Sequence, residues 1–364
     1  MLAITVTSKK VTPKTALKRH LKMFNCALLG ILATLGQASA EQVSIHDPVM
    51  AKEAEQYYLF STGPGITYYS SKDKIHWTLA GRVFETEPSW AREIAPGFNS
   101  HLWAPDIIQH NGLFYLYYSV SAFGKNTSAI GVTVNKTLDK NSKDYQWTDK
   151  GIILQSVPNR DAWNAIDPNI IVDEKGTPWM SFGSFWQGLK LVKLNPDFIS
   201  IAKPEEWHTL AKLERPALVA ETEPGPAQIE APFIYKKDSY YYLFVSYGLC
   251  CRGDDSTYHL AVGRAKDVTG PYLDKEGKDM AQGGGTVLLH GTQAWPGLGH
   301  NSVYAFDGKD YLVFHAYESA DNGLQKLKMA ELSWRQGWPV VDPKALNQYQ
   351  SVLVEPVGKN NDSN

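Results

Sequence analysis

Short apolar runs with alternating polar positions recur along the chain, and each begins after a polar turn. The first run of each pair is rich in aromatic and β-branched residues, at 57–61, 113–120, 178–185, 240–247 and 311–317. A second strand-like run follows in every case, at 66–70, 129–134, 189–194, 259–264 and 327–332. Turn residues such as Asn111-Gly112 and Asp307-Gly308 separate the runs, which is typical of β-hairpins. After residue 40 we find no long apolar pattern with a 3.6-residue period, so few helices are expected.

A short phrase opens each of the five pairs of runs. Its copies are His46-Asp47-Pro48, Trp103-Ala104-Pro105, Ile166-Asp167-Pro168, Glu230-Ala231-Pro232 and the degenerate Gly299-His300-Asn301. The last residues of successive copies are 57, 63, 64 and 69 positions apart, and such spacing indicates radially repeated units. We therefore predict an all-β fold, a five-bladed β-propeller, as a single domain over residues 41–357. Consecutive sandwiches would need a linker, and the Pro- and Gly-rich segment 222–228 fits better as a loop between blades.

Acidic residues occupy only three of the five copies, whereas a structural aspartate that capped every blade would recur in all of them. Asp47 and Asp167 directly precede the aligned proline and Glu230 lies one position further back, while Trp103 and His300 stand at matching places in the other copies. The innermost strands of a propeller line its channel, so these side chains should converge. Carboxyl groups in one concave site suit glycosidic-bond cleavage, in which one protonates the departing oxygen and another activates water or attacks. A third can raise the pKa of the acid by repulsion, although a single Asp before Pro is often only a turn former.

Two further residue types at the repeat suggest ligands. Trp103 and Trp186 lie close to the acids when the repeats are aligned, and an aromatic face suits the C–H groups of a sugar ring. His300 would face the channel, where it either coordinates an ion or a water, or serves as a hydrogen-bonded structural residue. Calcium prefers oxygen ligands, so one histidine with several waters would be an atypical calcium site. Zinc is less favoured, because we find no second His or Cys at ligand spacing.

The first 40 residues have the features of a secretory signal peptide. They carry six basic residues and no acid, an apolar run at 24–35, and Ala38-Ser39-Ala40 before Glu41, which predicts cleavage at that point. The apolar run is shorter than the roughly 20 residues of a membrane-spanning helix. Without this leader 30 basic residues face 38 acidic ones, which argues against a nucleic-acid partner. We expect a secreted or periplasmic monomer with no membrane association after cleavage and a flexible tail at 358–364.

After cleavage Cys250 and Cys251 are the remaining cysteines. Adjacent cysteines cannot join distant segments, so a disulfide between them would close a local ring. The sequence leaves their redox state open.

The five phrases and their neighbours resemble the motifs of glycoside hydrolase family 43. The matching segments are 46–48, 103–106, 164–169, 229–232 and 299–302. Together with segment 121–131 they are most similar to the secreted endo-α-1,5-L-arabinanases of that family, over about residues 44–338. The resemblance implies a five-bladed propeller and inversion at the anomeric carbon. It also implies that Asp47 is the general base, Glu230 the general acid, and Asp167 the residue that orients the acid and modulates its pKa.

The same resemblance implies a binding groove for arabinan. Its expected residues, beside Trp103, are Phe123, Gly124, Asn164, Ser184, Phe185 and Trp186. His300 is expected to coordinate a central calcium chiefly through water, and no organic cofactor is expected. Related propellers that act on fructosides open with Trp-x-Asn-Asp-Pro-Asn, whereas this chain has 44–49 as Ser-Ile-His-Asp-Pro-Val.

Three functions follow from these observations. The leading interpretation is an exported endo-acting hydrolase of arabinan, the pectin side chain. The second is an exo-acting arabinofuranosidase or β-xylosidase, because loop lengths that open or close the groove are poorly visible in sequence. The third is a non-catalytic carbohydrate-binding propeller, which the retained acids disfavour because a lectin gains nothing from carboxylates that repel one another.

Overall fold

The computed structural model describes residues 40–353, and strands dominate them. Apart from Ala40, the predicted leader 1–40 lies outside these residues, as does the predicted tail 358–364. The helical elements of the described chain are short, which confirms the expectation of few helices. They are α1 (Ala91–Ile94), η1 (Gly253–Asp255), η2 (Met280–Gln282), η3 (Ser319–Asp321) and η4 (Pro343–Asn347).

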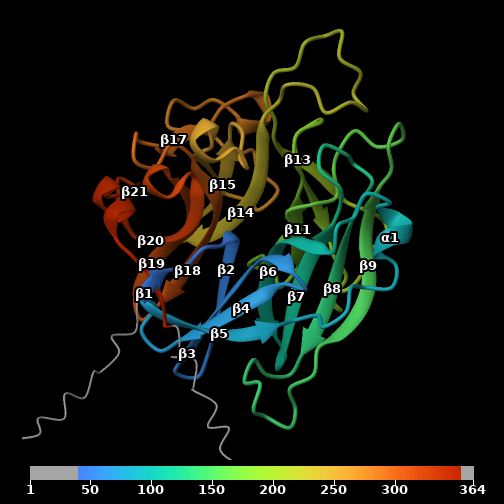
Figure 1. The fold of residues 1–364 in the computed structure, drawn as a ribbon. Helices are drawn as coiled ribbons and strands as arrows, with labels where there is room; N and C mark the ends of the chain where they lie inside the picture. Colours follow the sequence, from blue (N-terminus) through green and yellow to red (C-terminus); the bar gives the residue numbers. More distant parts are fainter. Residues whose placement is uncertain (1–39, 354–364) are drawn as a thin grey trace, which may run out of the picture. The chain divides into compact units, whose positions relative to one another are not determined.

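The strands form five antiparallel units of four strands each, in chain order, and these are the blades of the predicted five-bladed propeller (Figure 1). Blade 1 contains β2 (His46–Glu53), β3 (Gln56–Pro64), β4 (Thr67–Ser71) and β5 (His76–Arg82). Blade 2 contains β6 (His101–His110), β7 (Leu113–Val120), β8 (Ser128–Asn135) and β9 (Thr148–Ser156). Blade 3 contains β10 (Asn169–Val172), β11 (Pro178–Phe182), β12 (Leu189–Lys193) and β13 (Trp207–Ala211). Blade 4 contains β14 (Ile229–Lys237), β15 (Tyr240–Tyr247), β16 (His259–Ala265) and β17 (Thr286–Leu289). Blade 5 contains β18 (Leu298–Phe306), β19 (Lys309–Glu318), β20 (Leu324–Arg335) and β21 (Trp338–Val341).

The predicted pairs of runs are the second and third strands of the blades. β7 and β15 match their predicted bounds fully, whereas β11 ends at Phe182, three residues earlier than predicted. The Pro- and Gly-rich segment 222–228 lies between β13 and β14, so it is an inter-blade loop as predicted. The outermost strands were not predicted, because β9 for example is largely exposed or half-buried and lacks a regular apolar alternation.

Both ends of the described chain add to the outer edge of blade 1. β22 (Ser351–Leu353) pairs in parallel with β5 and antiparallel with β1 (Ala40–Gln42). The backbone N–H of Leu327 in blade 5 donates to the carbonyl of Val43 at 2.9 Å. Blades 1 and 2 are joined by a short pairing between β3 and β6. These contacts tie the last blade to the first and close the ring.

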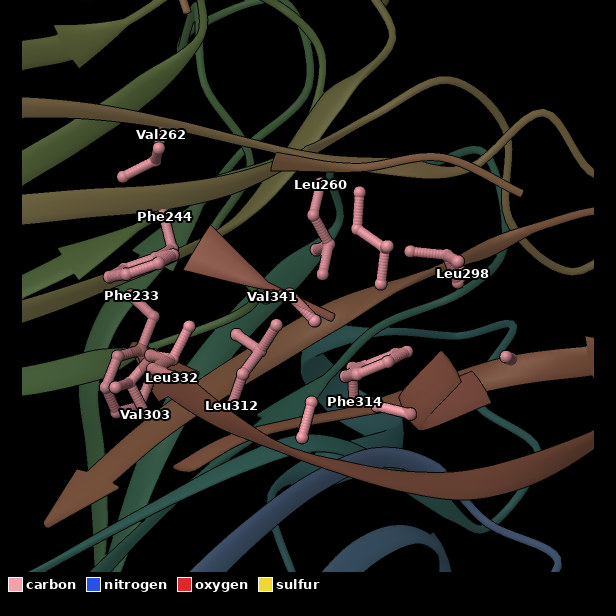
Figure 2. Packing of buried hydrophobic residues seen from close by; sticks show 14 of the residues in the cluster. Phe233, Phe244, Leu260, Val262, Leu298, Val303, Leu312, Phe314, Leu332 and Val341 are labelled. Carbon is pink, nitrogen blue, oxygen red and sulfur yellow. The ribbon is translucent and has the colours of Figure 1, made fainter. Parts of the chain in front are cut away.

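The hydrophobic core is divided among the five interfaces between neighbouring blades. Figure 2 shows the interface of blades 4 and 5, where Phe244 and Leu260 from one blade pack with Leu312 and Phe314 from the other. Comparable clusters join blades 1 and 2, 2 and 3, 3 and 4, and 5 and 1. Burial of apolar surface contributes about 25 cal/mol per Å², so every interface helps to hold the ring that positions the channel residues.

The repeated phrase builds the same backbone feature in each blade. The residue before the aligned position has a positive φ in all five copies, namely Asp47 (53°), Ala104 (44°), Asp167 (58°), Ala231 (56°) and His300 (49°). In blades 1, 2, 4 and 5 the pairing register shifts there, and in blade 3 the strand begins two residues later. A positive φ is uncommon for residues other than glycine, and bulges of this kind re-aim side chains beside active sites.

Candidate active site

The three predicted catalytic acids come together at these bulges. Asp47 lies in β2, Glu230 lies in β14, and Asp167 precedes β10. The three are close enough for the charges of Asp47 and Glu230 to raise the pKa of Asp167. The structure therefore gathers side chains that are more than 180 residues apart in sequence.

Asp47 is held as an ionised carboxylate. Its Oδ1 lies 3.1 Å from Nδ1 of His300 and 3.7 Å from Nδ1 of both His46 and His315, and its Oδ2 accepts a hydrogen bond from the Thr62 hydroxyl. Burial alone would raise the pKa of Asp47, but the three histidines outweigh burial and hold that pKa well below its usual range. An ionised carboxylate of this kind can accept a proton from water, as a general base must.

The pKa of Glu230 is shifted in the opposite direction from that of Asp47. Burial, opposed by its hydrogen bonds and reinforced by the charge of Asp47, raises the pKa of Glu230 above its usual value. The Ser184 hydroxyl donates to Oε2 and the Tyr258 hydroxyl donates to Oε1, both at 2.8 Å. Two carboxyl groups in one site are thus pushed toward different protonation states, which is the arrangement that separates an acid from a base.

Asp167 is the most enclosed of the three acids, at 6% exposed. Burial and then the charges of Glu230 and Asp47 raise its pKa well above the ordinary value. Its Oδ2 accepts the backbone N–H of Ala231 at 3.2 Å, which fixes it against the residue that follows Glu230. Asp167 and Glu230 therefore titrate as a pair in which one ionised group disfavours the other.

A ring of inter-blade hydrogen bonds supports the bulges, and sequence reasoning missed it. The bulge N–H of Ala104 donates to Thr62, that of Asp167 to Ser119, that of His300 to Ser246, and that of Asp47 to Nδ1 of His315. Each acceptor is in the second strand of the preceding blade, opposite the residue that precedes the bulge. In blade 3 the corresponding residue is Gly183, which has no side chain to accept a hydrogen bond and whose N–H donates to the Ile166 carbonyl. The bulge N–H of Ala231 therefore donates to the carboxylate of Asp167. An alignment of the second runs on these positions would have revealed the pattern.

The predicted substrate-binding residues fall into an exposed and an enclosed group. Phe123 is 79% exposed and Gly124 is also exposed, both in the β7–β8 connection, whereas Trp103 in β6 is half-buried. Phe185 is half-buried, and Ser184 and Asn164 are buried, the latter donating to the Lys125 carbonyl at 3.3 Å.

Trp186 is buried, with 4% of its surface exposed. Its indole N–H donates to the Thr222 carbonyl at 2.9 Å, and its own carbonyl accepts from Arg215 at 2.8 Å. The ring therefore supports the 212–228 loop in this structure, and a stacking role for it stays a prediction.

His300 lies in β18 beside Asp47, as its place in the fifth copy predicts. A hard cation near this imidazole would need water for most of its ligands, because calcium takes six to eight oxygens. A second group, His46, Asp47 and His315, offers one ligand atom from each residue within 4.8 Å. Two imidazole nitrogens and one carboxylate suit a transition metal better than calcium.

Fold and site together define a hydrolase of glycosidic bonds, because a propeller channel holds carboxyl groups tuned to opposite protonation states. The family model for glycosyl hydrolases family 43 matches residues 41–339, and the chain belongs to that family, as its motifs predicted.

Three comparisons place the chain within the family. It is 64% identical to the extracellular exo-α-(1→5)-L-arabinofuranosidase of Cellvibrio japonicus, over 89% of this chain and 93% of the relative. It is 39% identical to the extracellular endo-α-(1→5)-L-arabinanase 1 of Bacillus subtilis, over 90% of this chain and 98% of that protein. The solved structure of Cellvibrio cellulosa α-L-arabinanase complexed with arabinohexaose is 64% identical, with a TM-score of 0.85 over 86% of this chain and all of that one.

The relatives also bear on localisation. Two of them, at 64% and 39% identity, are extracellular enzymes, and the predicted export of this chain is thereby confirmed. Within residues 40–353 no helix has the length and apolar character needed to cross a membrane.

Proposed function

We propose that this protein hydrolyses the α-1,5-L-arabinofuranosidic bonds of arabinan. The observation that carries the proposal is the pairing of a low-pKa Asp47 with a high-pKa Glu230 in one channel. The substrate class is supported by the arabinohexaose in the related Cellvibrio structure and by the names of both relatives.

The residues divide the reaction between them. Glu230, protonated, donates its proton to the departing oxygen, and Asp47, ionised, removes a proton from the attacking water. Water attacks the anomeric carbon directly in this scheme, so the configuration inverts in a single displacement. Asp167 holds the Glu230 segment through Ala231, and the charges of Glu230 and Asp47 add to burial in raising its own pKa.

We propose that cleavage begins at a chain end. The exo-acting relative shares 64% of aligned residues with this chain, against 39% for the endo-acting one. The endo mode expected from the sequence motifs is the second candidate, favoured by the endo-acting name of that more distant relative.

Early products on debranched linear arabinan separate the two modes. An exo enzyme releases one short product from the first minutes while viscosity falls slowly, and it releases little dye from cross-linked dyed arabinan. An endo enzyme yields a ladder of oligosaccharides, a rapid fall in viscosity and abundant soluble dye. Should Asp47→Asn and Glu230→Gln both retain full activity, the proposed chemistry is wrong in either mode.

A partly hydrated calcium at His300 is also proposed. The ion would share the channel with Asp47, and its charge would offset repulsion among the three acids. His300 would supply an imidazole nitrogen, and water would supply most of the remaining ligands.

A further inference from the structure

The Cys250 and Cys251 pair forms a disulfide in the connection between β15 and β16. β15 pairs Ser246 with Glu230 two residues before this connection begins, so the disulfide lies at the active-site end of blade 4. Cys251 is exposed and has a φ of 64°, and its backbone N–H donates to the Tyr317 hydroxyl at 2.7 Å. The disulfide turn thus contacts a side chain from blade 5.

Tyr317 extends that contact to the histidines around Asp47. It is 2% exposed, and its backbone N–H is fixed to the Gly297 carbonyl at 2.9 Å. Its hydroxyl oxygen lies 3.3 Å from Nε2 of His315 and 3.4 Å from Nε2 of His46. The two imidazole rings lie side by side, with centroids 4.3 Å apart, and the Nδ1 of each lies 3.7 Å from Asp47 Oδ1.

The hydrogen-bond pattern assigns the protons along this path. Nδ1 of His315 accepts the N–H of Asp47 at 3.2 Å, so neutral His315 carries its proton on Nε2 and donates it to Tyr317. The Tyr317 oxygen accepts from His315 and Cys251, and Nε2 of His46 and the Ser256 hydroxyl are the partners left for its one proton. A hydroxyl donates once and accepts twice, so Cys251 and His315 fill the acceptor capacity of Tyr317.

We propose that the Cys250–Cys251 disulfide is a redox-sensitive positioning element, which holds Tyr317 so that Tyr317 fixes His46 and His315 against Asp47. The proposal rests on Asp47 acting as the base in the proposed function. Reduction by a dithiol breaks the S–S bond and forms two thiols, while the dithiol loses two electrons and two protons and closes to its own disulfide. Disulfides persist in the oxidising compartments to which exported proteins go, so the oxidised form is the working one.

Reduction should release the contact because of the backbone at Cys251. A positive φ is unfavourable for a residue other than glycine, and the covalent ring restricts the rotation that would relieve it. Once the bond is broken, rotation at Cys251 turns its N–H away from Tyr317. The ends of the connection stay tied, because Leu249 donates to the Thr257 hydroxyl at 3.0 Å and Thr257 donates back to the Leu249 carbonyl at 3.1 Å. The change should therefore be local and reversible.

The test compares oxidised and dithiol-treated enzyme with three variants, after mass spectrometry of the 250–251 peptide has confirmed its thiol state. In the wild type, reduction should lower kcat roughly two- to tenfold, the scale of one neutral hydrogen bond, with KM changed less than twofold and full recovery on reoxidation. The Cys250→Ser/Cys251→Ser variant should match reduced wild type and ignore the dithiol. Tyr317→Phe should have a low kcat that the dithiol does not lower further. Tyr272→Phe, which loses a buried hydrogen bond to Val268 in blade 4, should respond like wild type.

A second readout separates positioning of the base from damage to the acid. An aryl arabinoside with an acidic phenol needs little general acid help but still needs the base, so the loss of kcat on reduction should be equal on this substrate and on arabinan. Unchanged kcat in wild type with two free thiols would overturn the proposal, as would Tyr317→Phe enzyme that keeps the full response. If Asp47→Asn is itself fully active, the proposed function fails, whereas redox insensitivity with an essential Asp47 removes this inference alone.

Discussion

Ser184 and Tyr258 should set the pH at which Glu230 stops acting as an acid. Each donates a hydrogen bond to a different oxygen of the Glu230 carboxyl, at 2.8 Å. Both bonds favour the ionised form, and they lower the pKa of Glu230 against the larger effect of burial, which raises it. Removing either donor should therefore raise this pKa. Because the acid works only while protonated, the alkaline limb of the pH–rate profile should move to higher pH in Ser184→Ala and in Tyr258→Phe.

The expected size follows from the energy of one such bond. A hydrogen bond to a charged group contributes about 1.5–3 kcal/mol, and part of it survives when the carboxyl is protonated. A differential near 1 kcal/mol corresponds to about 0.7 pH unit, since one unit of pKa is about 1.4 kcal/mol. Burial raises the pKa of Tyr258 well above 10, so its hydroxyl remains a donor throughout the assay range. We expect each single variant to shift the limb by about 0.5–1 unit.

Little change in the alkaline limb is expected when the neighbouring acid is replaced. Burial and the charges of Glu230 and Asp47 raise the pKa of Asp167 well above its ordinary value, so Asp167 is neutral while Glu230 titrates, and Asp167→Asn should leave the alkaline limb near its wild-type position. The pH dependence of kcat/KM, measured from initial rates on linear arabinan, reports the pKa values of the free enzyme. Each profile should be normalised to its own maximum. Tyr272→Phe is the matched control for Tyr258→Phe, because its hydroxyl bonds Val268 in blade 4.

A limb that stays in place, or moves to lower pH, in both hydroxyl variants would refute the role of Ser184 and Tyr258. A shift in Asp167→Asn as large as that in Ser184→Ala would also contradict it. If Tyr272→Phe shifts the limb as far as Tyr258→Phe, the effect comes from a general loosening of the structure and not from the lost bond to Glu230.

Three further predictions concern the chemistry. Glu230→Ala should lower turnover on arabinan by a factor on the order of 10²–10⁴ but lose far less on an aryl arabinoside with an acidic phenol; equal losses would indicate a structural role. The first product should show an inverted anomer by NMR, and a retained anomer would contradict direct attack by water activated at Asp47. His300→Ala should reduce activity without unfolding the domain and shift the pH optimum, and metal-free wild type should show the same shift; an unchanged profile and thermal midpoint after chelation, with no ion found, would leave His300 as a hydrogen-bonded channel residue.

The sequence predicted the strands whose side chains follow a repeated pattern. It did not predict the strands whose positions depend on backbone pairing. The runs at 113–120 and 240–247 became β7 and β15 with the predicted bounds, because a strand buried on both sides is apolar along its whole length. The outer strand β9 and the joining strands β1 and β22 escaped prediction. Their positions depend on pairing with strands far away in the chain, which local patterning does not encode.

The same distinction applies to the candidate site. The acids Asp47, Asp167 and Glu230 were found because they depart from a repeated phrase. Tyr258 and Tyr317 were missed, because each is one more aromatic residue in a chain with 19 tyrosines. Their importance comes from the hydroxyl group, which reaches a residue of another strand or blade only once the ring is closed.

The inter-blade ring shows how departures from a repeat create chemistry. Thr62, Ser119 and Ser246 supply hydroxyl acceptors for the bulge N–H of the next blade. Two members of the ring differ, and each lies beside one of the proposed reacting acids. Gly183 offers no side chain, so the N–H of Ala231 turns to Asp167 and binds that acid to the Glu230 segment. His315 replaces a hydroxyl with an imidazole whose Nδ1 accepts the N–H of Asp47 at 3.2 Å, which fixes the proposed base. A propeller with five identical positions could only repeat one environment around its axis, and these two exceptions give Asp47 and Asp167 different surroundings.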